Sequence, residues 1–319
     1  MRDAVTDVTQ PTHVAVIVVT YNSATVIEDA LCQLVGVLDG GGEVIVVDNC
    51  STDDSVARAR QVDPRIVVLA LDDNYGFAVG VNRGLALARS GYVCLLNPDA
   101  AVTSEALVRL AGWLLEDPTM GAIAPLVVQG EGYSGNSGAY RFPTIWRTFS
   151  TLWGVSLISG PGWLEGTTLL TRQIRVRRDV DWLTGACVVM PTDFLREVGG
   201  LTERWFMYGE DIDLGLRIAR GGKRVVVDPS VVVHHRVGGS SEKRRSALEA
   251  AWLVNQWQFY RSDLAPRHSY AEVWRIVAVL GVGGRAVLHL ASGVLRRKPD
   301  AKSRGKWLWR CGVALARER

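Results

Sequence analysis

Residues 13–20 read HVAVIVVT, a continuous apolar run with the length of a β-strand. Two more runs of the same kind follow, EVIVVD at residues 43–48 and RIVVLA at residues 65–70. Strands that are apolar on both faces are typical of a parallel sheet covered by helices on both sides. These three runs therefore predict an α/β fold.

Helical periodicity occupies the intervals around these strands. The apolar residues of ATVIEDALCQLVGVL (24–38) recur at steps of three and four, which predicts one amphipathic helix. Two more helices are predicted over FAVGVNRGLALARS (77–90) and SEALVRLAGWLLED (104–117), the second with Ser104 as its N-cap. Alternating strands and helices predict a mostly parallel central sheet flanked by helices.

The composition is that of a globular chain. Of its 319 residues 48% are hydrophobic and 22% are charged, and the formal net charge is only +3. Its five cysteines are scattered and include no Cys-x-x-Cys pair, which favours a reduced, cytosolic protein. The N-terminal segment has no long apolar stretch, so we expect no signal peptide there.

Polar clusters follow the ends of the predicted strands. Because ligands bind beyond the carboxyl ends of the strands in such sheets, these clusters are the first candidates for a binding site. They are Thr20, Tyr21 and Asn22; Asp48 and Asn49; Asn74; and Asn97, Pro98 and Asp99.

Two aspartates in these clusters have both a binding and a structural interpretation. Asp48 can accept the N–H group of a pyrimidine base, or it can cap the next helix together with Asp53. Asp99 ends the sequence LLNPD, in which Asn, Pro and Asp also favour a plain turn. A single aspartate nevertheless suffices to hold Mg²⁺ when a diphosphate supplies other ligands.

The segment DNYGFAVGVNRG (73–84) contains three glycines but no dinucleotide-binding fingerprint. Gly76, Gly80 and Gly84 are four residues apart, which differs from G-x-G-x-x-G and argues against a Rossmann dehydrogenase. Gly76 is instead expected to let the chain turn sharply after Asn74.

The segment WFMYGEDIDLGLRIARGG (205–222) places three carboxylates within four residues. Glu210, Asp211 and Asp213 stand at the start of a predicted helix, where acidic side chains complement the helix dipole. Three carboxylates this close repel one another, which is more than a helix end requires. The cluster is therefore a candidate catalytic base or metal site.

Two histidines, His234 and His235, end the apolar strand of VVVHHRVGGSS (231–241). Neighbouring residues of a strand point to opposite faces, so only one of the two is expected to contact a metal or a phosphate. A purely structural role is the alternative.

Two further segments lack a simple strand or helix pattern. Residues 130–180 are rich in Gly and Ser and then in aromatic residues without a clear period, and are expected to form a mobile connection near the substrate. Residues 273–295 are apolar over a spanning length, but Arg275, Arg285 and His289 interrupt them. This favours one or two amphipathic helices over a transmembrane span.

The C-terminal tail is strongly basic. Residues 296–319 contain nine Lys or Arg residues against two acidic ones. Together with Trp274, Trp307 and Trp309, this composition is typical of helices that lie at an anionic membrane surface. A solvated helix pair that packs a homodimer is the alternative, and the lack of a recognition motif argues against nucleic acid.

Taken in order, these motifs resemble one family. VIVVTYN, VVDNCSTD, NYGFAVGVNRG, LLNPDA, WLTGACVVM, FMYGEDIDLGLRIARGG and HHRVGGSS follow one another as in the inverting glycosyltransferases of family 2, which have the GT-A fold. The resemblance runs from Val14 to Ser241, and NPDA with FMYGEDID is similar to the rhamnosyltransferase branch. Those enzymes add L-rhamnose from dTDP-rhamnose, often to a polyprenyl-diphosphate sugar in bacterial cell-wall synthesis.

The resemblance implies a role for each cluster. Asp211 falls where the family has its catalytic base, and Asp99 corresponds to the metal-binding acid of the family's Asp-x-Asp, with Asn97 in place of the first acid. His235 fits the family's H-x-x-G-x-S spacing better than His234, as a second ligand of Mg²⁺ or Mn²⁺. The implied nucleotide-sugar pocket is Thr20, Tyr21, Asn22, Asp48, Asn74, Gly76, Asn97 and Asp99, and the implied acceptor side is Trp182, Gly185, Ala186 and Glu210.

The resemblance also implies a domain plan and a location. Residues 1–240 would form a GT-A catalytic domain, with a nucleotide-sugar half at 13–128 and an acceptor half at 180–240. Residues 241–319 would form a basic helical extension on the inner face of the plasma membrane, with the enzyme in the cytoplasm. Two alternatives stay open: another family 2 sugar transferase, galactofuranosyl or mannosyl, and a non-catalytic partner protein that binds sugar nucleotides.

Overall fold

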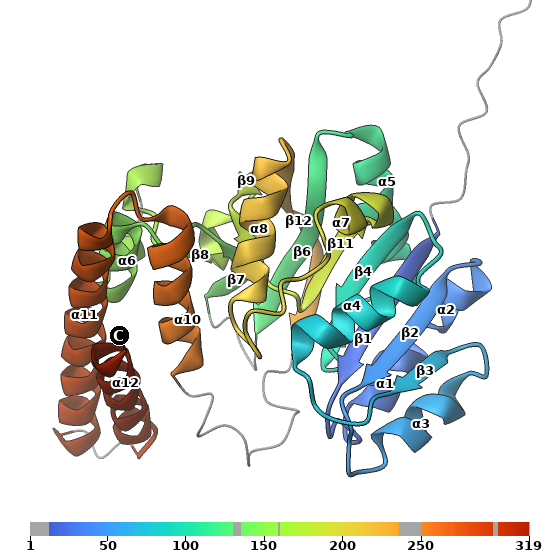
Figure 1. Ribbon diagram of the computed structural model, residues 1–319, viewed down its shortest axis with the longest axis horizontal. Helices are drawn as coiled ribbons and strands as arrows, with labels where there is room; N and C mark the ends of the chain where they lie inside the picture. The colour runs from blue at the N-terminus through green and yellow to red at the C-terminus, as the bar shows by residue number, and fades with distance from the viewer. Residues whose placement is uncertain (1–12, 130–134, 159, 236–249, 296–298, 319) are drawn as a thin grey trace, which may run out of the picture.

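A computed structural model of the protein describes residues 13–129, 135–158, 160–235, 250–295 and 299–318. Across these residues the centre of the molecule is a nine-stranded mixed sheet (Figure 1). Its strands follow the order β3-β2-β1-β4-β11-β6-β12-β5, and β9 pairs with β12. A smaller sheet has the order β10-β7-β8.

The strands of the main sheet are β1 (Val14–Thr20), β2 (Glu43–Asp48), β3 (Val67–Ala70), β4 (Tyr92–Leu96), β5 (Ala100–Ala101), β6 (Met120–Gln129), β9 (Arg178–Val180), β11 (Cys187–Pro191) and β12 (Arg224–His235). Those of the small sheet are β7 (Asn136–Tyr140), β8 (Thr168–Leu170) and β10 (Trp182–Leu183). The α-helices are α1 (Ile27–Cys32), α2 (Val35–Asp39), α3 (Ser55–Val62), α4 (Phe77–Leu87), α5 (Ser104–Glu116), α6 (Ile145–Leu152), α7 (Thr192–Glu197), α8 (Glu210–Arg220), α10 (Ala251–Phe259), α11 (His268–Leu295) and α12 (Pro299–Arg317). Short 3₁₀ turns are η1 (Val155–Leu157), η2 (Gly162–Leu164) and η3 (Thr171–Gln173), and η5 (Tyr260–Leu264) is a π-helical turn.

Four parallel strands set the direction of the main sheet. β1 pairs in parallel with β2 and β4, and β2 with β3. β11 runs antiparallel to β4 and β6, and β12 returns parallel to β6. The predicted mixed, mostly parallel sheet is confirmed, and the carboxyl ends of β1, β2 and β4 open on one edge.

The first strand contributes to both buried layers, because successive side chains of a strand point to opposite faces. Val14, Val16 and Val18 pack with α1, α2 and α5 on one face of the sheet. Ile17 and Val19 pack with α4, α7 and α8 on the other face. This burial on two sides explains why the whole run of β1 is apolar.

Two local predictions about helices were wrong. Residues 24–38 form two short helices, α1 and α2, because Leu34 and Val37 donate to carbonyls three residues back and tighten the chain between them. Helix α5 is capped by Thr103, whose hydroxyl accepts the N–H of Ala106 at 3.3 Å, and Ser104 is already helical. Both Thr and Ser are good caps, so their order in the sequence left the choice open.

The expectation of a mobile connection over residues 130–180 also needs correction. Residues 130–134 and 159 lie outside the described residues, but the others form β7, β8 and β9, and α6 packs against α11. These elements are held in place by strand pairing and by aromatic contacts between residues that are distant in the sequence. Such contacts leave no local period in the sequence.

The C-terminal helices form a layer of their own beside the sheet (Figure 1). α11 and α12 pack along each other, and α6 packs on α11. Trp274, expected at a membrane surface, is instead fully buried and donates its indole N–H to Pro143 O at 2.7 Å. Within the described residues, α11 is the one helix that is long and apolar enough to cross a membrane by length and composition alone.

Candidate active site

The loops that follow β1 and β2 are tied together around Asp48. Thr20 and Asp48 are register partners, so the two strands end side by side. The buried Asp48 carboxylate accepts the backbone N–H of Ser51 at 2.8 Å and the Ser51 hydroxyl at 2.5 Å. Ser51 Oγ in turn accepts the backbone N–H of Asn22 at 2.8 Å. Ser51, which sequence reasoning missed, thus orients two predicted nucleotide-binding residues.

Asp53, rather than Asp48, takes the structural role in this loop. Its carboxylate accepts the backbone N–H groups of Ala24 and Ser55, both at 3.0 Å. Burial raises the pKa of Asp53, but hydrogen bonds from Ser55 and Ala24 outweigh it and lower that pKa. Because the Asp48 hydrogen bonds go to Ser51, which precedes α3, Asp48 is not the cap of that helix.

Two buried polar atoms next to Asp48 lack hydrogen-bond partners among the described residues. The hydroxyl of Thr20 and the side-chain oxygen of Asn49 make no hydrogen bond within the described part of the chain. The two residues are only 1% and 3% exposed. Buried polar groups are rarely left unsatisfied, so these atoms mark the edge as a place for a ligand or water. Tyr21, which follows Thr20, is partly exposed.

Gly76 holds the start of α4 against the loop before α8. Its φ of +91° confirms the predicted turn after Asn74, whose side-chain oxygen accepts the Gly76 N–H at 3.1 Å. A Cβ atom at Gly76 would lie 2.3 Å from Phe206 O. Phe77 donates its backbone N–H to that same oxygen at 3.3 Å. Only glycine fits both the backbone conformation and the space.

Asn97, Asp99 and His235 meet at the next part of the edge. His235 pairs with Ala100 across β12 and β5, which brings its ring towards the residues before β5. His235 Nε2 lies 2.9 Å from Asp99 Oδ1 and 3.1 Å from Asn97 Nδ2. His234, on the opposite face of the strand, is exposed.

This group fits a divalent metal ion that has few protein ligands. A carboxylate oxygen and an imidazole nitrogen 2.9 Å apart are a suitable donor pair, and both side chains are 11% exposed. No cluster of three or more His, Cys, Asp or Glu side chains is placed to hold a metal in the described part of the chain. A metal held here would therefore depend on a bound substrate for further ligands.

Asp211 is linked to this group through two residues that precede β11. Asp211 Oδ2 accepts the backbone N–H of Gly185 at 3.1 Å. The carbonyl oxygen of Ala186 accepts the backbone N–H of Asn97, also at 3.1 Å. The antiparallel register of β11 and β4 fixes this arrangement. Gly185 and Ala186 thus join the predicted base to the predicted metal group.

The three carboxylates at the start of α8 have different environments. Glu210, predicted on the acceptor side, is only 4% exposed and accepts the backbone N–H of the preceding residue at 2.9 Å. Asp213 forms an ion pair with Arg217 at 2.7 Å. Asp211 has the backbone hydrogen bond described above. Of the three, Asp211 is therefore the carboxylate best placed for chemistry at the edge of the sheet.

The surroundings of Asp211 also change its acidity. Burial and the neighbouring charge of Glu210 raise the pKa of Asp211 well above its usual value, and the hydrogen bond from Gly185 opposes them only in part. Burial likewise raises the pKa of Glu210. A carboxylate with a raised pKa takes up a proton more readily, as a general base does when its pKa lies closer to the operating pH.

Tyr140 and Trp182 form a stacked aromatic pair near Asp211. Their ring centroids are 4.0 Å apart, and their planes differ by 10°. Burial raises the pKa of the Tyr140 phenol, a hydrogen bond from Asn136 lowers it, and the charge of Asp211 raises it further. Trp182 was predicted for the acceptor side, whereas Tyr140 was missed because it lies in the segment without a local period.

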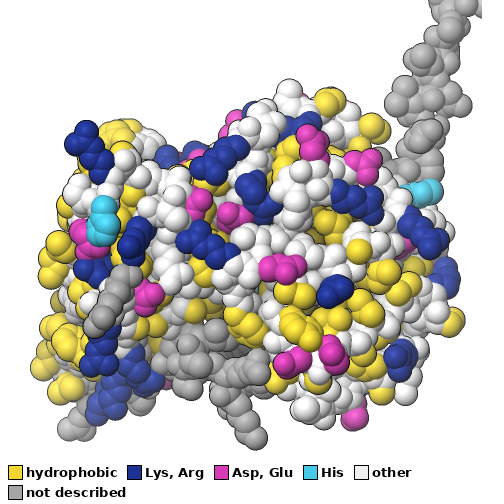
Figure 2. All heavy atoms as spheres, viewed as in Figure 1, with side chains coloured by type: hydrophobic (Ala, Val, Ile, Leu, Met, Phe, Trp, Pro, Cys, Tyr) yellow, Lys and Arg dark blue, Asp and Glu magenta, His cyan; other side chains and the backbone are white. Residues whose placement is uncertain are grey.

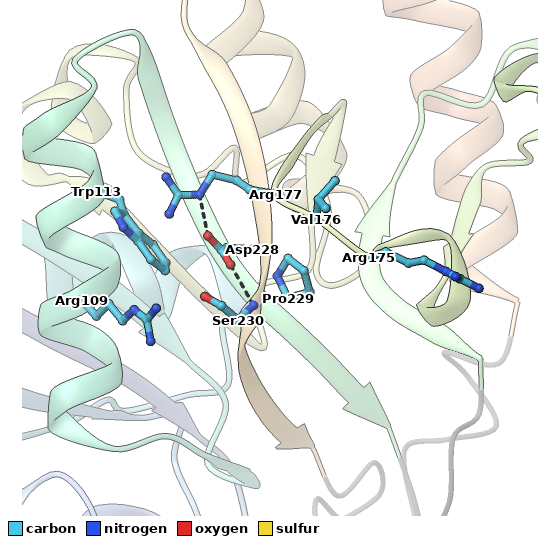
Figure 3. A pocket seen from close by; sticks show the side chains of 8 residues that line it. All are labelled: Arg109, Trp113, Arg175, Val176, Arg177, Asp228, Pro229 and Ser230. Carbon is cyan, nitrogen blue, oxygen red and sulfur yellow. Dashed lines mark hydrogen bonds and ion pairs between the residues drawn. The ribbon is translucent and has the colours of Figure 1, made fainter.

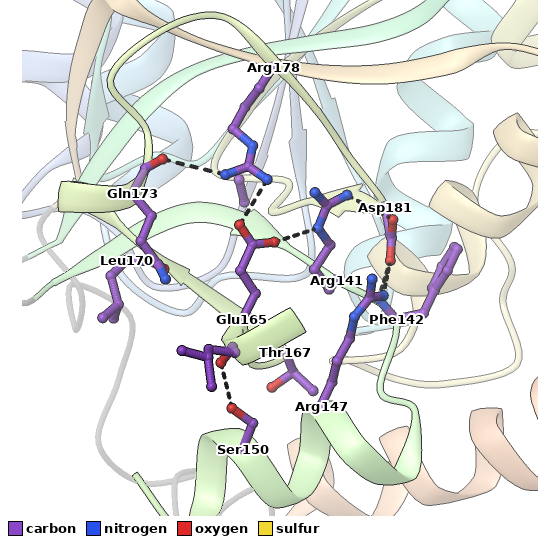
Figure 4. Close-up of polar contacts among 12 residues, drawn as sticks. Arg141, Phe142, Arg147, Ser150, Glu165, Thr167, Leu170, Gln173, Arg178 and Asp181 are labelled. Atoms are coloured by element: carbon purple, nitrogen blue, oxygen red, sulfur yellow. Dashed lines mark hydrogen bonds and ion pairs between the residues drawn. The ribbon is translucent and has the colours of Figure 1, made fainter. Parts of the chain in front are cut away.

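An ion-pair network supports this aromatic pair (Figure 4). Glu165 contacts Arg141 at 3.2 Å and Arg178 at 2.9 Å. Asp181 contacts Arg141 at 3.2 Å and Arg147 at 2.7 Å. Arg141 and Asp181 adjoin the two stacked rings in the sequence, so the network fixes the strands that carry them.

A separate hollow of about 520 Å³ lies between α5 and β12 (Figure 3). Two guanidinium groups contact the Trp113 ring there, Arg177 at 3.8 Å and Arg109 at 4.9 Å from its centre. Asp228 accepts hydrogen bonds from Arg177 and from the backbone N–H of Ser230, next to a bulge in β12. None of the predicted site residues lines this hollow. Its contacts hold α5 to the sheet.

Comparison with known proteins gives a family and a relative. Residues 15–175 match the model of glycosyl transferase family 2. An N-acetylglucosaminyl-diphospho-decaprenol L-rhamnosyltransferase of Mycobacterium tuberculosis is 31% identical over 309 residues. The alignment covers 92% of this chain and 96% of the relative.

Two solved structures share the architecture. The mannosyltransferase PcManGT of Pyrobaculum calidifontis, in complex with GDP-Man and Mn²⁺, superposes with a TM-score of 0.58 at 20% identity over 95% of this chain and 86% of that one. GalNAc-T7 with UDP, GalNAc and Mn²⁺ superposes with a TM-score of 0.57 at 15% identity over 83% of this chain and 55% of that one. At these identities the likeness concerns the fold alone, and it confirms the predicted fold class.

Proposed function

Because the chain belongs to glycosyl transferase family 2, we propose that it transfers L-rhamnose from dTDP-rhamnose to a hydroxyl group of a polyprenyl-diphosphate-linked sugar. The name of the mycobacterial relative supports L-rhamnose as the transferred sugar and a polyprenyl-diphosphate-linked sugar as the acceptor class, since that enzyme aligns with nearly the whole chain. The observation that carries the chemistry is the link from Asp211 through Gly185 and Ala186 to Asn97. The product would serve bacterial cell-wall or surface-polysaccharide synthesis.

The reaction is a single displacement at the anomeric carbon. The acceptor hydroxyl attacks this carbon from the side opposite the diphosphate, the new C–O bond forms, and dTDP leaves with the electron pair of the broken bond. Asp211 takes the hydroxyl proton as the bond forms. A positioned general base contributes about 10²–10⁴ in rate, or about 3–5 kcal/mol, so most of the turnover would depend on this carboxylate.

The donor nucleotide would lie across the ends of β1 and β2. Each carboxylate oxygen has a second lone pair, so Asp48 can accept the N–H of the thymine base while it keeps its hydrogen bonds to Ser51. Thr20, with its unpartnered hydroxyl, lies in register with Asp48. The remaining proposed donor residues are Tyr21, Asn22, Asn74, Gly76, Asn97 and Asp99.

Asp99 and His235 would hold a divalent cation, Mg²⁺ or Mn²⁺. When bound, this ion would offset the negative charge that develops on the departing diphosphate. Asn97 stands where the family's commoner Asp-x-Asp motif has its first acid, so the protein alone offers little negative charge to the ion. We therefore expect tight metal binding only together with the nucleotide.

The acceptor would approach from the side of Trp182. Its indole, stacked on Tyr140, offers a flat apolar surface for a sugar ring next to Asp211. Gly185 has no side chain at the point nearest the base, and a Cβ there would lie 3.1 Å from Asp211 Oδ1. Gly185 and Ala186 thus keep space for the attacking hydroxyl.

A polyprenyl-linked acceptor places the enzyme at a membrane. We propose that residues 1–240 form the catalytic domain and that residues 241–319 associate peripherally with the inner face of the plasma membrane. The helix pair α11 and α12 lies beside the sheet and can contact lipid there (Figure 1).

A thermal-shift panel with the full-length protein tests the donor. Each nucleotide sugar is added with Mg²⁺ or Mn²⁺. We expect dTDP-rhamnose to raise the melting temperature more than any UDP- or GDP-sugar, because the ligand that binds the folded protein most tightly stabilises it most. Larger shifts with UDP-galactofuranose or GDP-mannose would overturn the rhamnosyl assignment in favour of the alternative transferases. Mass spectrometry of a synthetic polyprenyl-diphosphate sugar after reaction checks the acceptor.

A further inference from the structure

The outward face of α11 carries an apolar stripe. Its exposed side chains recur mainly at steps of three, four and seven residues, so they lie on one side of the helix. They are Tyr270, Val273, Ile276, Leu280, Val287, Leu288, Val294 and Leu295, each at least 47% exposed. The opposite side, which includes Trp274, Ala278 and Val282, is fully buried. We call the exposed side chains the α11 stripe.

A second group of exposed apolar side chains occupies residues 146–163. Trp146, Trp153 and Trp163 are 44%, 54% and 63% exposed, and Leu157 and Ile158 are 57% and 59% exposed. Tryptophan is enriched where proteins meet the headgroup region of a bilayer. This group, which we call the aromatic patch, lies in a segment for which the sequence predicted a mobile connection and no membrane contact.

The aromatic patch adjoins the α11 stripe. Arg285 on α11 donates hydrogen bonds to the carbonyl oxygens of Leu152 at 2.7 Å and Thr151 at 2.9 Å. A side chain at Gly281 would meet Leu152 and the indole of Trp153. Helix α6 therefore packs directly on the helix that carries the stripe. Figure 2 shows apolar side chains along the edge of the molecule where α11 lies in Figure 1.

Positive charge borders this surface. Four exposed basic residues lie in the first two thirds of α12: Lys302, Arg304, Lys306 and Arg310. Dark-blue side chains gather at the lower left of Figure 2, over the end of the α11–α12 pair. Burial lowers the pKa of His289 on α11, and the charges of Arg304 and Arg285 lower it further. Cations from both helices therefore lie close together at this end, where an anionic headgroup would relieve their repulsion.

We propose that the α11 stripe and the aromatic patch form one surface that docks on an anionic lipid bilayer. This inference rests on the proposed peripheral location, and it places α6 and α11 at the membrane with α12 at the rim. An apolar helix face with tryptophans and neighbouring Lys and Arg has the composition of interfacial membrane helices. A second copy of the chain fits less well, because the stripe and the patch contain no acidic side chain that could pair with its basic residues.

Vesicle sedimentation of the full-length protein tests the surface. The vesicles are phosphatidylcholine alone or phosphatidylcholine with about 30% phosphatidylglycerol, and the wild type is expected to bind the anionic ones. The double variants Trp153→Ser/Trp163→Ser and Leu280→Ser/Leu288→Ser are each expected to lower this binding at least about tenfold, because each removes two large apolar side chains. Arg304→Gln/Lys306→Gln is expected to weaken binding to the anionic vesicles only.

The matched control is Val108→Ser/Leu115→Ser on α5, whose side chains are 50% and 47% exposed. We expect this variant to bind vesicles as the wild type does. Equal loss in the control, or full binding by both apolar variants, would overturn the proposal. So would wild-type protein that resists carbonate extraction, since α11 would then span the membrane. A dimer lost in the same variants, without vesicle binding by the wild type, would assign the surface to a second copy.

The outcome for the surface is separable from that for the proposed function. Transfer to a water-soluble acceptor analogue is expected to persist in all the surface variants, because none of the altered residues lies in the proposed site. Vesicle binding by a protein that makes no use of dTDP-rhamnose would refute the donor assignment and leave the docking surface standing.

Discussion

His235 Nε2 lies 2.9 Å from Asp99 Oδ1, and the pairing of His235 with Ala100 brings these two side chains together. The neighbouring His234 is exposed on the opposite face of β12. The two adjacent histidines thus have contrasting surroundings, and His234 provides an internal control for His235.

We expect Asp99→Asn and His235→Ala each to weaken Mn²⁺ binding in the presence of dTDP by at least about tenfold, because the first removes the carboxylate charge and the second removes the imidazole donor of the proposed pair. Calorimetric titration of Mn²⁺ into the protein with dTDP measures this affinity. His234→Ala is the control and should bind Mn²⁺ as the wild type does. A loss in His234→Ala as large as that in His235→Ala would contradict the proposed ligand pair.

The assignment of Asp211 as the base predicts a loss of turnover without a loss of donor binding. Asp211→Asn keeps an oxygen that can accept the Gly185 N–H but cannot take a proton, so kcat should fall about 10²–10⁴-fold. The affinity for dTDP, measured by thermal shift, should stay close to that of the wild type. Unchanged turnover would exclude the role.

Asp213→Asn is the matched control for this substitution, two residues further along α8. It breaks the ion pair with Arg217, whose guanidinium still donates to the carbonyl oxygen of Gly200 at 2.8 Å. We expect a loss of about 1–2 kcal/mol in the free energy of unfolding, because the pair is partly buried, and little change in kcat. A drop in kcat equal to that of Asp211→Asn would point to a disturbed helix instead of a missing base.

The sheet and the gathering of polar residues at one of its edges could be predicted because each depends on a local pattern. The run of β1 is apolar on both faces and ends at Thr20, as expected, and Asp48 ends β2. Once a parallel sheet is accepted, the polar residues after its strands must share one edge. Thr20, Asp48 and Asn97 were therefore assigned to one edge without knowledge of their contacts.

The contacts around the proposed acceptor side could not be predicted from local patterns, because they join residues that are distant in the sequence. Tyr140 stacks on Trp182, and Phe77 reaches the carbonyl oxygen of Phe206. Neither contact leaves a period in the sequence. The same limit explains Trp274, whose composition-based placement at a membrane was wrong because α6 and the preceding turn cover it.

The ion-pair network behind the aromatic pair predicts a stability effect. Glu165→Ala would leave Arg141 and Arg178, both partly buried, without a shared carboxylate. We expect the free energy of unfolding, measured with urea, to fall by about 1–3 kcal/mol. The control is Glu28→Ala, which removes an ion pair whose two side chains are 57% and 45% exposed and should change stability by less than about 0.5 kcal/mol. Equal effects of the two substitutions would contradict the importance of the network.

Asp211 also makes the stability of the protein depend on pH. Burial and the charge of Glu210 raise its pKa in the folded state, whereas the unfolded chain titrates near the ordinary value of about 4. A group with a raised folded pKa contributes stability that is fully present below the unfolded pKa and is lost as the pH rises through the folded pKa. Asp211→Asn cannot ionise and so escapes this loss.

The free energy of unfolding of Asp211→Asn, relative to that of the wild type, should therefore increase as the pH rises from about 4 towards neutral and above. Urea unfolding of both proteins across this range measures the difference, and the shared Glu210 is present in both. The raised pKa also predicts that kcat/KM of the wild type falls on the acidic side at a higher pH than an ordinary aspartate would give, because the base must be unprotonated. A stability difference that stays constant, or that shrinks as the pH rises, would show that Asp211 ionises freely in the folded protein.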